Sequence, residues 1–168
     1  MELNNMASIA LPLFQDLENT ASAAVARVDC ARKQTHTAQR WLAGFLCAPA
    51  LPGLALMPRN LRVAINLLNS PEVDLLSEEE LRQVAHRVQQ LHGKLRKLVV
   101  LSQDLGLSHI PIYHHLLAQV EQRTDHLGSI AEGLYMSLND DFQTMLTDAA
   151  EELRATRSAS RGSLIEQM

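Results

Sequence analysis

The chain has 168 residues, a formal net charge of −4, 46% hydrophobic and 20% charged residues, which is typical of a globular domain rather than a disordered chain. It carries no strong basic excess, so it lacks the phosphate-neutralising charge of a dedicated nucleic-acid binder. Only 4% of the residues are aromatic and seven are glycine, which together with many Leu, Ala, Gln and Glu residues favours helices over sheet.

The first predicted element is a long helix over residues 12–46. Its apolar or small residues recur three and four positions apart, the spacing of a helix face that packs on another helix. This predicted seam comprises Leu13, Leu17, Thr20, Ala24, Val28, Ala31, Thr35, Ala38, Leu42 and Phe45. Small residues dominate its middle, so we expect close approach to the neighbouring helices. A short, very apolar helix is predicted near residues 60–68.

The second long helix is predicted over residues 77–105. Ser77 and Glu80 have the spacing of a capping box, which begins a helix. Gly106 provides the left-handed conformation that ends a helix without strain. The predicted seam comprises Leu81, Val84, Val88, Leu91, Leu95, Leu98, Ser102 and Leu105.

The third long helix is predicted over residues 111–138, with Pro111 in the first turn, where proline is tolerated. Its seam comprises Tyr113, Leu117, Val120, Thr124, Leu127, Ala131, Leu134 and Leu138. Two seams of similar length joined by a short loop predict an antiparallel helical hairpin.

A last short helix is predicted near residues 140–156, capped by Asn139 or Asp140. Its apolar face comprises Phe142, Met145, Leu146, Ala149 and Leu153. Residues 158–168 are expected to form a flexible C-terminal tail. The predicted fold class is therefore all-α, an antiparallel bundle of three long and two short helices, with a single domain over residues 1–157.

Residues 41–57, WLAGFLCAPALPGLALM, form the most apolar stretch of the chain. A membrane span needs about 20 residues of helix, and prolines interrupt this stretch, so no transmembrane span is expected. Its second half, residues 48–57, is not expected to be helical for long. Two interpretations stay open, a buried connector at one end of the bundle or a docking patch for a partner. The candidate partner-binding residues are Trp41, Phe45, Leu51, Leu54, Leu56 and Met57.

Arg87-Val-Gln-Gln-Leu-His92 resembles the motif of an arginine, four residues and a histidine in the HEPN ribonucleases, which are all-helical domains of about this size. The resemblance covers these six residues and implies RNA cleavage by Arg87 and His92. A helical hairpin also places solvated charges at such positions beside its seam.

Six of the seven histidines fall between residues 86 and 126. A metal site inside a helical bundle needs histidines and carboxylates that converge from facing helices, commonly three or four residues apart. The weak candidates here are His114 and Glu121, which share a helix face two turns apart. Histidines outside a seam are usually solvated, so neither a metal nor another cofactor is expected.

Glycine-rich phosphate loops and nucleophile elbows do not occur in the sequence. We therefore expect a non-catalytic helical interaction or adaptor protein that binds a protein partner or a second copy of itself. No nucleic-acid partner is expected. The absence of a basic N-terminal signal region makes the cytoplasm the expected location. The alternatives are the ribonuclease, and a peripheral membrane-associated protein that uses residues 41–57.

Overall fold

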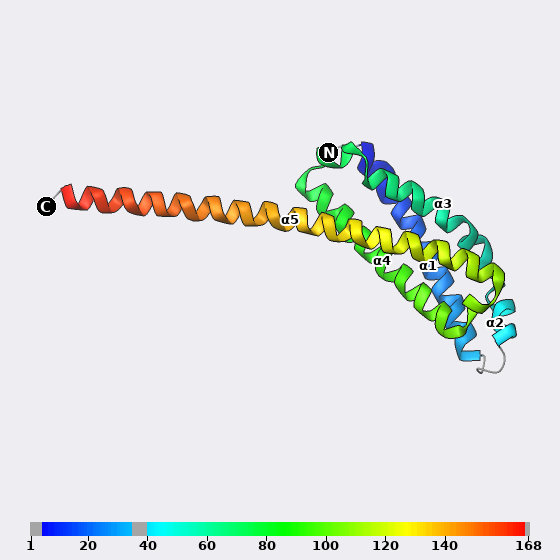
Figure 1. Cartoon of the computed structure of the whole chain (residues 1–168). Coiled ribbons are helices and arrows are strands. Elements are labelled where there is room, and N and C mark those ends of the chain that lie inside the picture. Colours follow the sequence, from blue (N-terminus) through cyan, green and yellow to red (C-terminus); the bar gives the residue numbers. More distant parts are fainter. Residues whose placement is uncertain (1–4, 35–39, 167–168) are drawn as a thin grey trace. The chain divides into compact units, whose positions relative to one another are not determined.

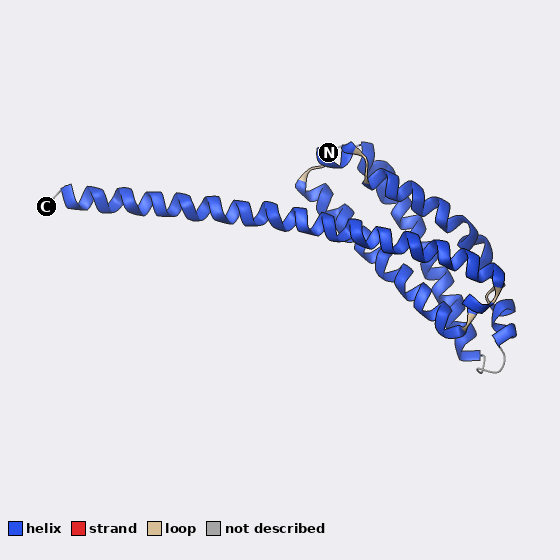
Figure 2. Ribbon diagram, viewed as in Figure 1, coloured by secondary structure: helices blue, strands red, loops and turns tan. Residues whose placement is uncertain are grey.

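A computed structural model describes residues 5–34 and 40–166 of the chain, with the side chains of residues 40–41, 140–146 and 159–166 left out of the description (Figure 1). Helices and short turns make up these described ranges, and no strand occurs in them (Figure 2). The all-α prediction is therefore confirmed. In chain order the elements are α1 (Asn5–Gln34), α2 (Arg40–Leu46), η2 (Ala48–Ala50), α3 (Leu51–Leu68), η3 (Pro71–Leu75), α4 (Glu78–Leu105), η4 (Leu107–His109) and α5 (Pro111–Glu166).

Helix α4 begins and ends as its sequence predicts. The Ser77 hydroxyl oxygen accepts a hydrogen bond from the Glu80 backbone amide at 3.2 Å, and the same hydroxyl donates to the Glu80 carboxylate at 3.1 Å. The carboxylate thus supports the cap through the serine side chain. Gly106 ends the helix in the left-handed conformation with φ of 81°. A residue with a Cβ would be strained there.

The hairpin of α4 and α5 packs along the two predicted seams. All predicted α4 positions are buried except Leu81, which is half-buried, and all predicted α5 positions are buried except Leu138. Arg96 lies 3.5 Å from Asp125, while His92 lies against Gly128. A lower number on α4 thus meets a higher number on α5, as an antiparallel pair requires. This part of the bundle follows directly from the spacing of apolar residues.

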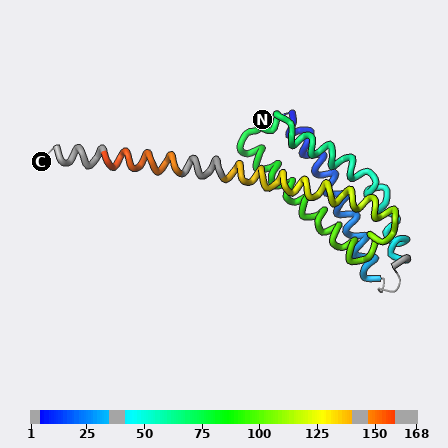
Figure 3. Tube along the Cα trace, in the orientation of Figure 1, coloured from blue at the N-terminus to red at the C-terminus, as the bar shows by residue number. Residues whose placement is uncertain are grey.

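Helix α1 packs against both α4 and α3 and carries ten buried residues. It runs antiparallel to α3 and in the same direction as α4 (Figure 3). Many of its buried residues are alanine, which permits the close approach expected from the sequence. The buried face is rotated slightly from the predicted one, because Phe14 and Ala21 are fully buried while Leu13 and Thr20 are half-buried.

The apolar residues after Leu46 form more helix than the sequence suggests. The prediction that residues 48–57 are not helical for long is wrong, because α3 begins at Leu51 and continues to Leu68. Pro52 lies in the first turn, where its missing amide hydrogen costs nothing. Pro58 lies inside the helix and is buried together with Leu54, Met57 and Leu61. Burial of this apolar face offsets the backbone hydrogen bond that Pro58 removes.

The predicted helix over 12–46 corresponds to α1 and α2, and its seam positions Thr35 and Ala38 lie outside the described residues. At the other end, the separate helix predicted over 140–156 is wrong, because α5 continues through that region to Glu166. The chain divides into two compact units, Met1–Glu132 and Gly133–Met168. A single domain over 1–157 with a flexible tail over 158–168 stays a prediction.

Candidate functional site

An apolar groove lies on the first unit, where α2, η2 and the start of α3 meet the beginning of α5. Its volume is about 370 Å³. Seven residues line it: Gly44, Phe45, Ala48, Leu51, Ile110, Ile112 and Tyr113. We call this surface the α2 groove. Two of the residues predicted to bind a partner, Phe45 and Leu51, belong to it.

Tyr113 and Gly44 hold the two sides of the α2 groove together. The Tyr113 hydroxyl donates a hydrogen bond of 2.6 Å to the Gly44 carbonyl oxygen. Burial raises the pKa of Tyr113 to about 12, so the hydroxyl keeps its proton and stays a donor at neutral pH. A Cβ at residue 44 would lie 2.9 Å from Ile110 Cδ1, so glycine allows α2 to approach the hairpin loop closely.

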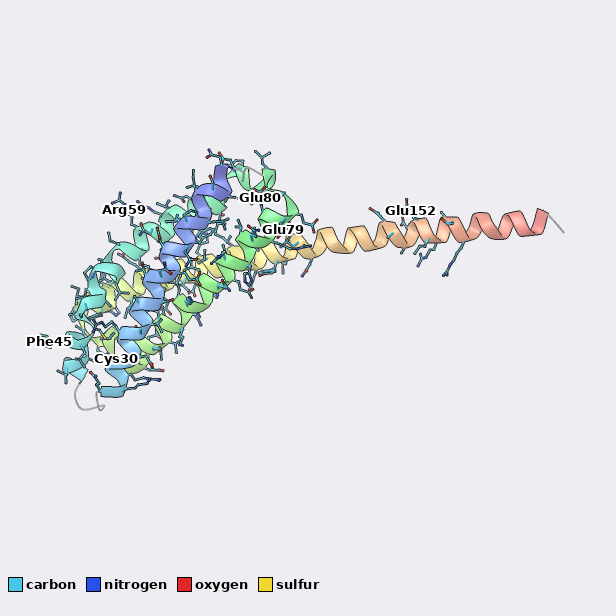
Figure 4. The ribbon with its side chains drawn as sticks, turned by 180° about the vertical axis from the view of Figure 1, so that it is seen from behind. Cys30, Phe45, Arg59, Glu79, Glu80 and Glu152 are labelled. Atoms are coloured by element: carbon cyan, nitrogen blue, oxygen red, sulfur yellow. The ribbon has the colours of Figure 1, made fainter. Side chains whose placement is uncertain are left out.

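Phe45 and Ile112 expose large apolar surfaces at the rim of the α2 groove. The Phe45 side chain is 72% exposed and that of Ile112 is 56% exposed. Figure 4 shows Phe45 pointing away from the neighbouring helices. The prediction that Phe45 belongs to the buried seam of the helix over 12–46 is wrong, because its side chain is exposed, whereas Ala43 of α2 and Cys47, the residue after α2, are buried. Exposed aromatic and aliphatic residues around a concavity are typical of an interaction surface.

The remaining predicted partner-binding residues divide between core and surface. Leu54 and Met57 are 1% and 0% exposed, so they belong to the buried face of α3 and cannot contact a partner. Leu56 is 58% exposed but does not line the α2 groove. The Trp41 side chain lies outside the described residues. Leu54 and Met57 are thus buried, as the first interpretation of residues 41–57 expected, but in helix α3 rather than in a connector, whereas Phe45 and Leu51 line the groove.

Arg87 and His92, the ribonuclease candidates, face different helices. The Arg87 Nη1 atom donates to Gln15 Oε1 at 2.8 Å and lies 3.6 Å from Glu18 Oε2, both on α1. His92 instead lies against Gly128 of α5, where an added Cβ would come within 2.7 Å of the His92 Nε2 atom. The structure thus gives each side chain a packing partner of its own and does not bring the two together.

Glu18 forms a buried ion cluster that the sequence analysis missed. Its side chain is 9% exposed, and its Oε1 atom lies 2.8 Å from Lys94 Nζ. The Glu18 Oε2 atom has only the 3.6 Å contact with Arg87, which is an ion pair without a hydrogen bond. A second, more polar groove of about 590 Å³ lies beside the cluster between α1 and α4, with Arg87 in its wall. The sequence does contain one indication of this cluster, because Glu18 follows Phe14 by four positions and therefore lies on the same face of α1, which the structure buries.

The metal candidates His114 and Glu121 are exposed and half-buried, respectively. Within residues 5–34 and 40–166, as far as their side chains are described, no group of three His, Cys, Asp or Glu side chains is arranged to hold a metal ion. Cys47 is buried in the core, and this burial raises its pKa to about 11. The thiol is therefore protonated at neutral pH and a poor nucleophile.

No helix in the described part of the chain combines the length and apolar character needed to cross a membrane. Comparison with known protein families, with curated proteins and with solved structures finds no match to this chain.

Proposed function

We propose that this chain is a helical adaptor protein whose α2 groove binds a short apolar segment of a partner protein. The observation that carries the proposal is the joint exposure of Phe45 and Ile112 around a concavity lined by apolar side chains. Exposed apolar surface of this kind costs free energy in water, and a partner that covers it recovers that free energy.

The lining of the α2 groove favours a protein segment over a polar metabolite. Small-molecule sites are orientated by converging polar groups, and their volumes range from about 300 to 1,000 Å³. The one polar side chain in this lining, Tyr113, already donates its hydroxyl hydrogen to Gly44. A groove of about 370 Å³ suits a few aliphatic or aromatic side chains. An amphipathic helix presents such side chains three and four positions apart.

The residue types of the α2 groove also favour a protein over a membrane surface. Membrane-surface helices present a broad apolar face flanked by basic side chains. Here the apolar residues surround a concavity, and the seven lining residues include no lysine or arginine.

Binding of a synthetic amphipathic peptide tests this proposal directly. The peptide carries leucines on one helical face, and a scrambled peptide of the same composition is the control. We expect the full-length chain to bind the amphipathic peptide more tightly. The variants Phe45→Ser and Ile112→Ser should each weaken that binding roughly tenfold, or about 1.4 kcal/mol, because each removes an apolar anchor.

The matched control is Leu75→Ser, since Leu75 is 75% exposed but lies outside the α2 groove. It should leave peptide binding unchanged. Equal binding of both peptides, or equal loss in the Leu75 and Phe45 variants, contradicts the proposal. Binding to phosphatidylserine vesicles that depends on Phe45, without peptide binding, would assign the groove to a lipid surface instead.

A further inference from the structure

The C-terminal part of α5 is a helix with an uncovered surface. Every side chain from Thr147 to Ser158 is exposed, including Leu153 at 64% (Figure 4, around Glu152). Most helical stability in proteins comes from packing of an apolar face rather than from intrinsic propensity. This segment therefore needs a partner if it is to gain the stabilisation that the other helices obtain from each other.

The apolar or small residues of this segment have the spacing of a two-stranded coiled coil. Ala149, Leu153 and Thr156 follow each other by steps of four and three, and Phe142 and Leu146 continue the same spacing upstream in the sequence. The Thr156 hydroxyl donates to the Glu152 carbonyl oxygen at 2.9 Å, so this polar group is satisfied within the helix. Its methyl group is then free to pack in a seam. We call residues 146–157 the C-terminal seam segment.

The C-terminal seam segment is distinct from the seam of the hairpin. The hairpin seam alternates steps of four and three up to Leu134 and Leu138, and the next apolar residue, Phe142, is four positions further on. Two successive steps of four interrupt the alternation of three and four, so the apolar residues from Phe142 onwards follow a different line along the helix surface from the hairpin seam. The second compact unit also begins in this region, at Gly133. One continuous helix thus carries two seams, and Ala149, Leu153 and Thr156 of the second seam are exposed.

Charged residues at the edges of this seam indicate which partner helix it can pack against. Glu152 directly precedes the seam residue Leu153, and Arg157 directly follows Thr156, so they flank the seam on opposite sides. Within its own helix, each has a like-charged neighbour: Asp148 lies four residues before Glu152, and Arg154 lies three residues before Arg157. Neither has an oppositely charged residue three or four positions away.

We propose that the C-terminal seam segment pairs with the same segment of a second copy of this chain, in parallel and in register. In such a pair, Glu152 of each copy faces Arg157 of the other, five residues further along, which is the usual ion pair across a parallel coiled coil. Two such pairs form by symmetry. An antiparallel pair would instead bring like-charged flanks together. This pairing uses a different surface from the α2 groove and is tested separately from it.

Sedimentation of the full-length chain over a concentration series tests the pairing. We expect a shift from the one-chain mass of 18.7 kDa towards twice that mass. Glu152→Arg and Arg157→Glu should each raise the dissociation constant roughly tenfold, because each replaces two attractions with two repulsions. An equimolar mixture of the two variants should restore association, since every cross-pair is again between opposite charges.

The matched controls are Asp148→Arg and Arg154→Glu, which reverse exposed charges away from the seam edges and should leave the dissociation constant unchanged. A chain that stays at 18.7 kDa at every concentration overturns the proposal. Equal effects of seam-edge and control reversals, or variants that fail to complement each other, overturn it as well. Circular dichroism of each variant shows that the helices remain folded.

Orientation is tested by Thr156→Cys in a Cys30→Ser background, which removes the exposed native thiol. Equal positions meet in a parallel, in-register pair, so this variant should form a disulfide between two copies under mild oxidation. An associated pair without this disulfide would contradict the parallel register.

Discussion

The ion cluster of Glu18 with Lys94 and Arg87 predicts an asymmetric response to mutation. Glu18 is 9% exposed, whereas the side chains of Lys94 and Arg87 are 43% and 42% exposed. Glu18→Gln releases two cations that can rehydrate, so it should cost about 1.5–3 kcal/mol, the range of a lost hydrogen bond to a charged group. The double variant Arg87→Met/Lys94→Met instead leaves a carboxylate buried without compensation, and should cost about 3–5 kcal/mol.

A triple variant, with Glu18→Met added to Arg87→Met/Lys94→Met, completes the test of this cluster. It removes the uncompensated charge, so most of the stability lost in the double variant should return. The free energy of unfolding is measured by urea denaturation followed by circular dichroism. Two results would refute the reasoning that Glu18 is the buried member of the cluster. One is an equal loss of unfolding free energy in Glu18→Gln and in the double variant, and the other is a triple variant that is no more stable than the double variant.

Three further predictions concern packing and pH. Gly128→Ala should displace the His92 ring, because the added Cβ would clash with it. The double variant Gly128→Ala/His92→Ala has no such clash and keeps the higher helix propensity of alanine at residue 128, so in urea denaturation it should be more stable than Gly128→Ala by about 1 kcal/mol. Burial raises the pKa of Cys47 from 9.0 to about 11 and that of Tyr113 from 10.0 to about 12, so folding favours both protonated forms. Unfolding free energy measured across pH should therefore be fully retained below pH 9 and fall as the pH rises to 12, because the unfolded chain loses these protons first. Leu95→Ala should cost about 2–5 kcal/mol by the same denaturation assay, because Leu95 is 0% exposed in the α4 seam.

The pH prediction and the Leu95 prediction each have a control in the chain. Cys47→Ala should flatten the fall in stability between pH 9 and 11, whereas Cys30→Ala should not, because Cys30 is exposed. Leu75→Ala, at a side chain that is 75% exposed, should change the unfolding free energy by less than about 0.5 kcal/mol. Two results would contradict the reasoning. One is a fall in unfolding free energy between pH 9 and 11 that Cys47→Ala leaves unchanged, and the other is an equal loss of unfolding free energy in Leu95→Ala and Leu75→Ala.

Regular spacing of large apolar residues made the hairpin predictable from the sequence. Leucine and valine recur at steps of three and four along α4 and α5, so one face of each helix is unambiguous, and Ser77 and Gly106 mark the ends of α4. In α1, alanines on several faces make the pattern ambiguous, and the predicted seam missed Phe14 and Glu18. Tertiary packing, rather than local spacing, selects the buried face there.

Proline positions limited the prediction for residues 41–57. Prolines commonly interrupt helices, yet Pro52 lies in the first turn of α3 and Pro58 lies on its buried face. The α2 groove could be predicted only in part, because two segments that are distant in the sequence form it. Phe45 and Leu51 came from the apolar stretch, but Ile110 and Ile112 come from the loop and first turn of a distant hairpin. Only the folded chain brings these two segments together.

Binding of an apolar partner segment in the α2 groove can be observed at the residues that line it by methyl NMR of isoleucine. The sequence contains six isoleucines, of which Ile110 and Ile112 line the groove. Ile65 is buried in α3 and Ile9 is exposed on α1, so both serve as internal references. On titration with the amphipathic peptide, we expect saturable shifts of the Ile110 and Ile112 methyl signals, while the signals of Ile65 and Ile9 stay unchanged. Unchanged groove signals, or equal shifts at all four residues, would contradict binding in the groove.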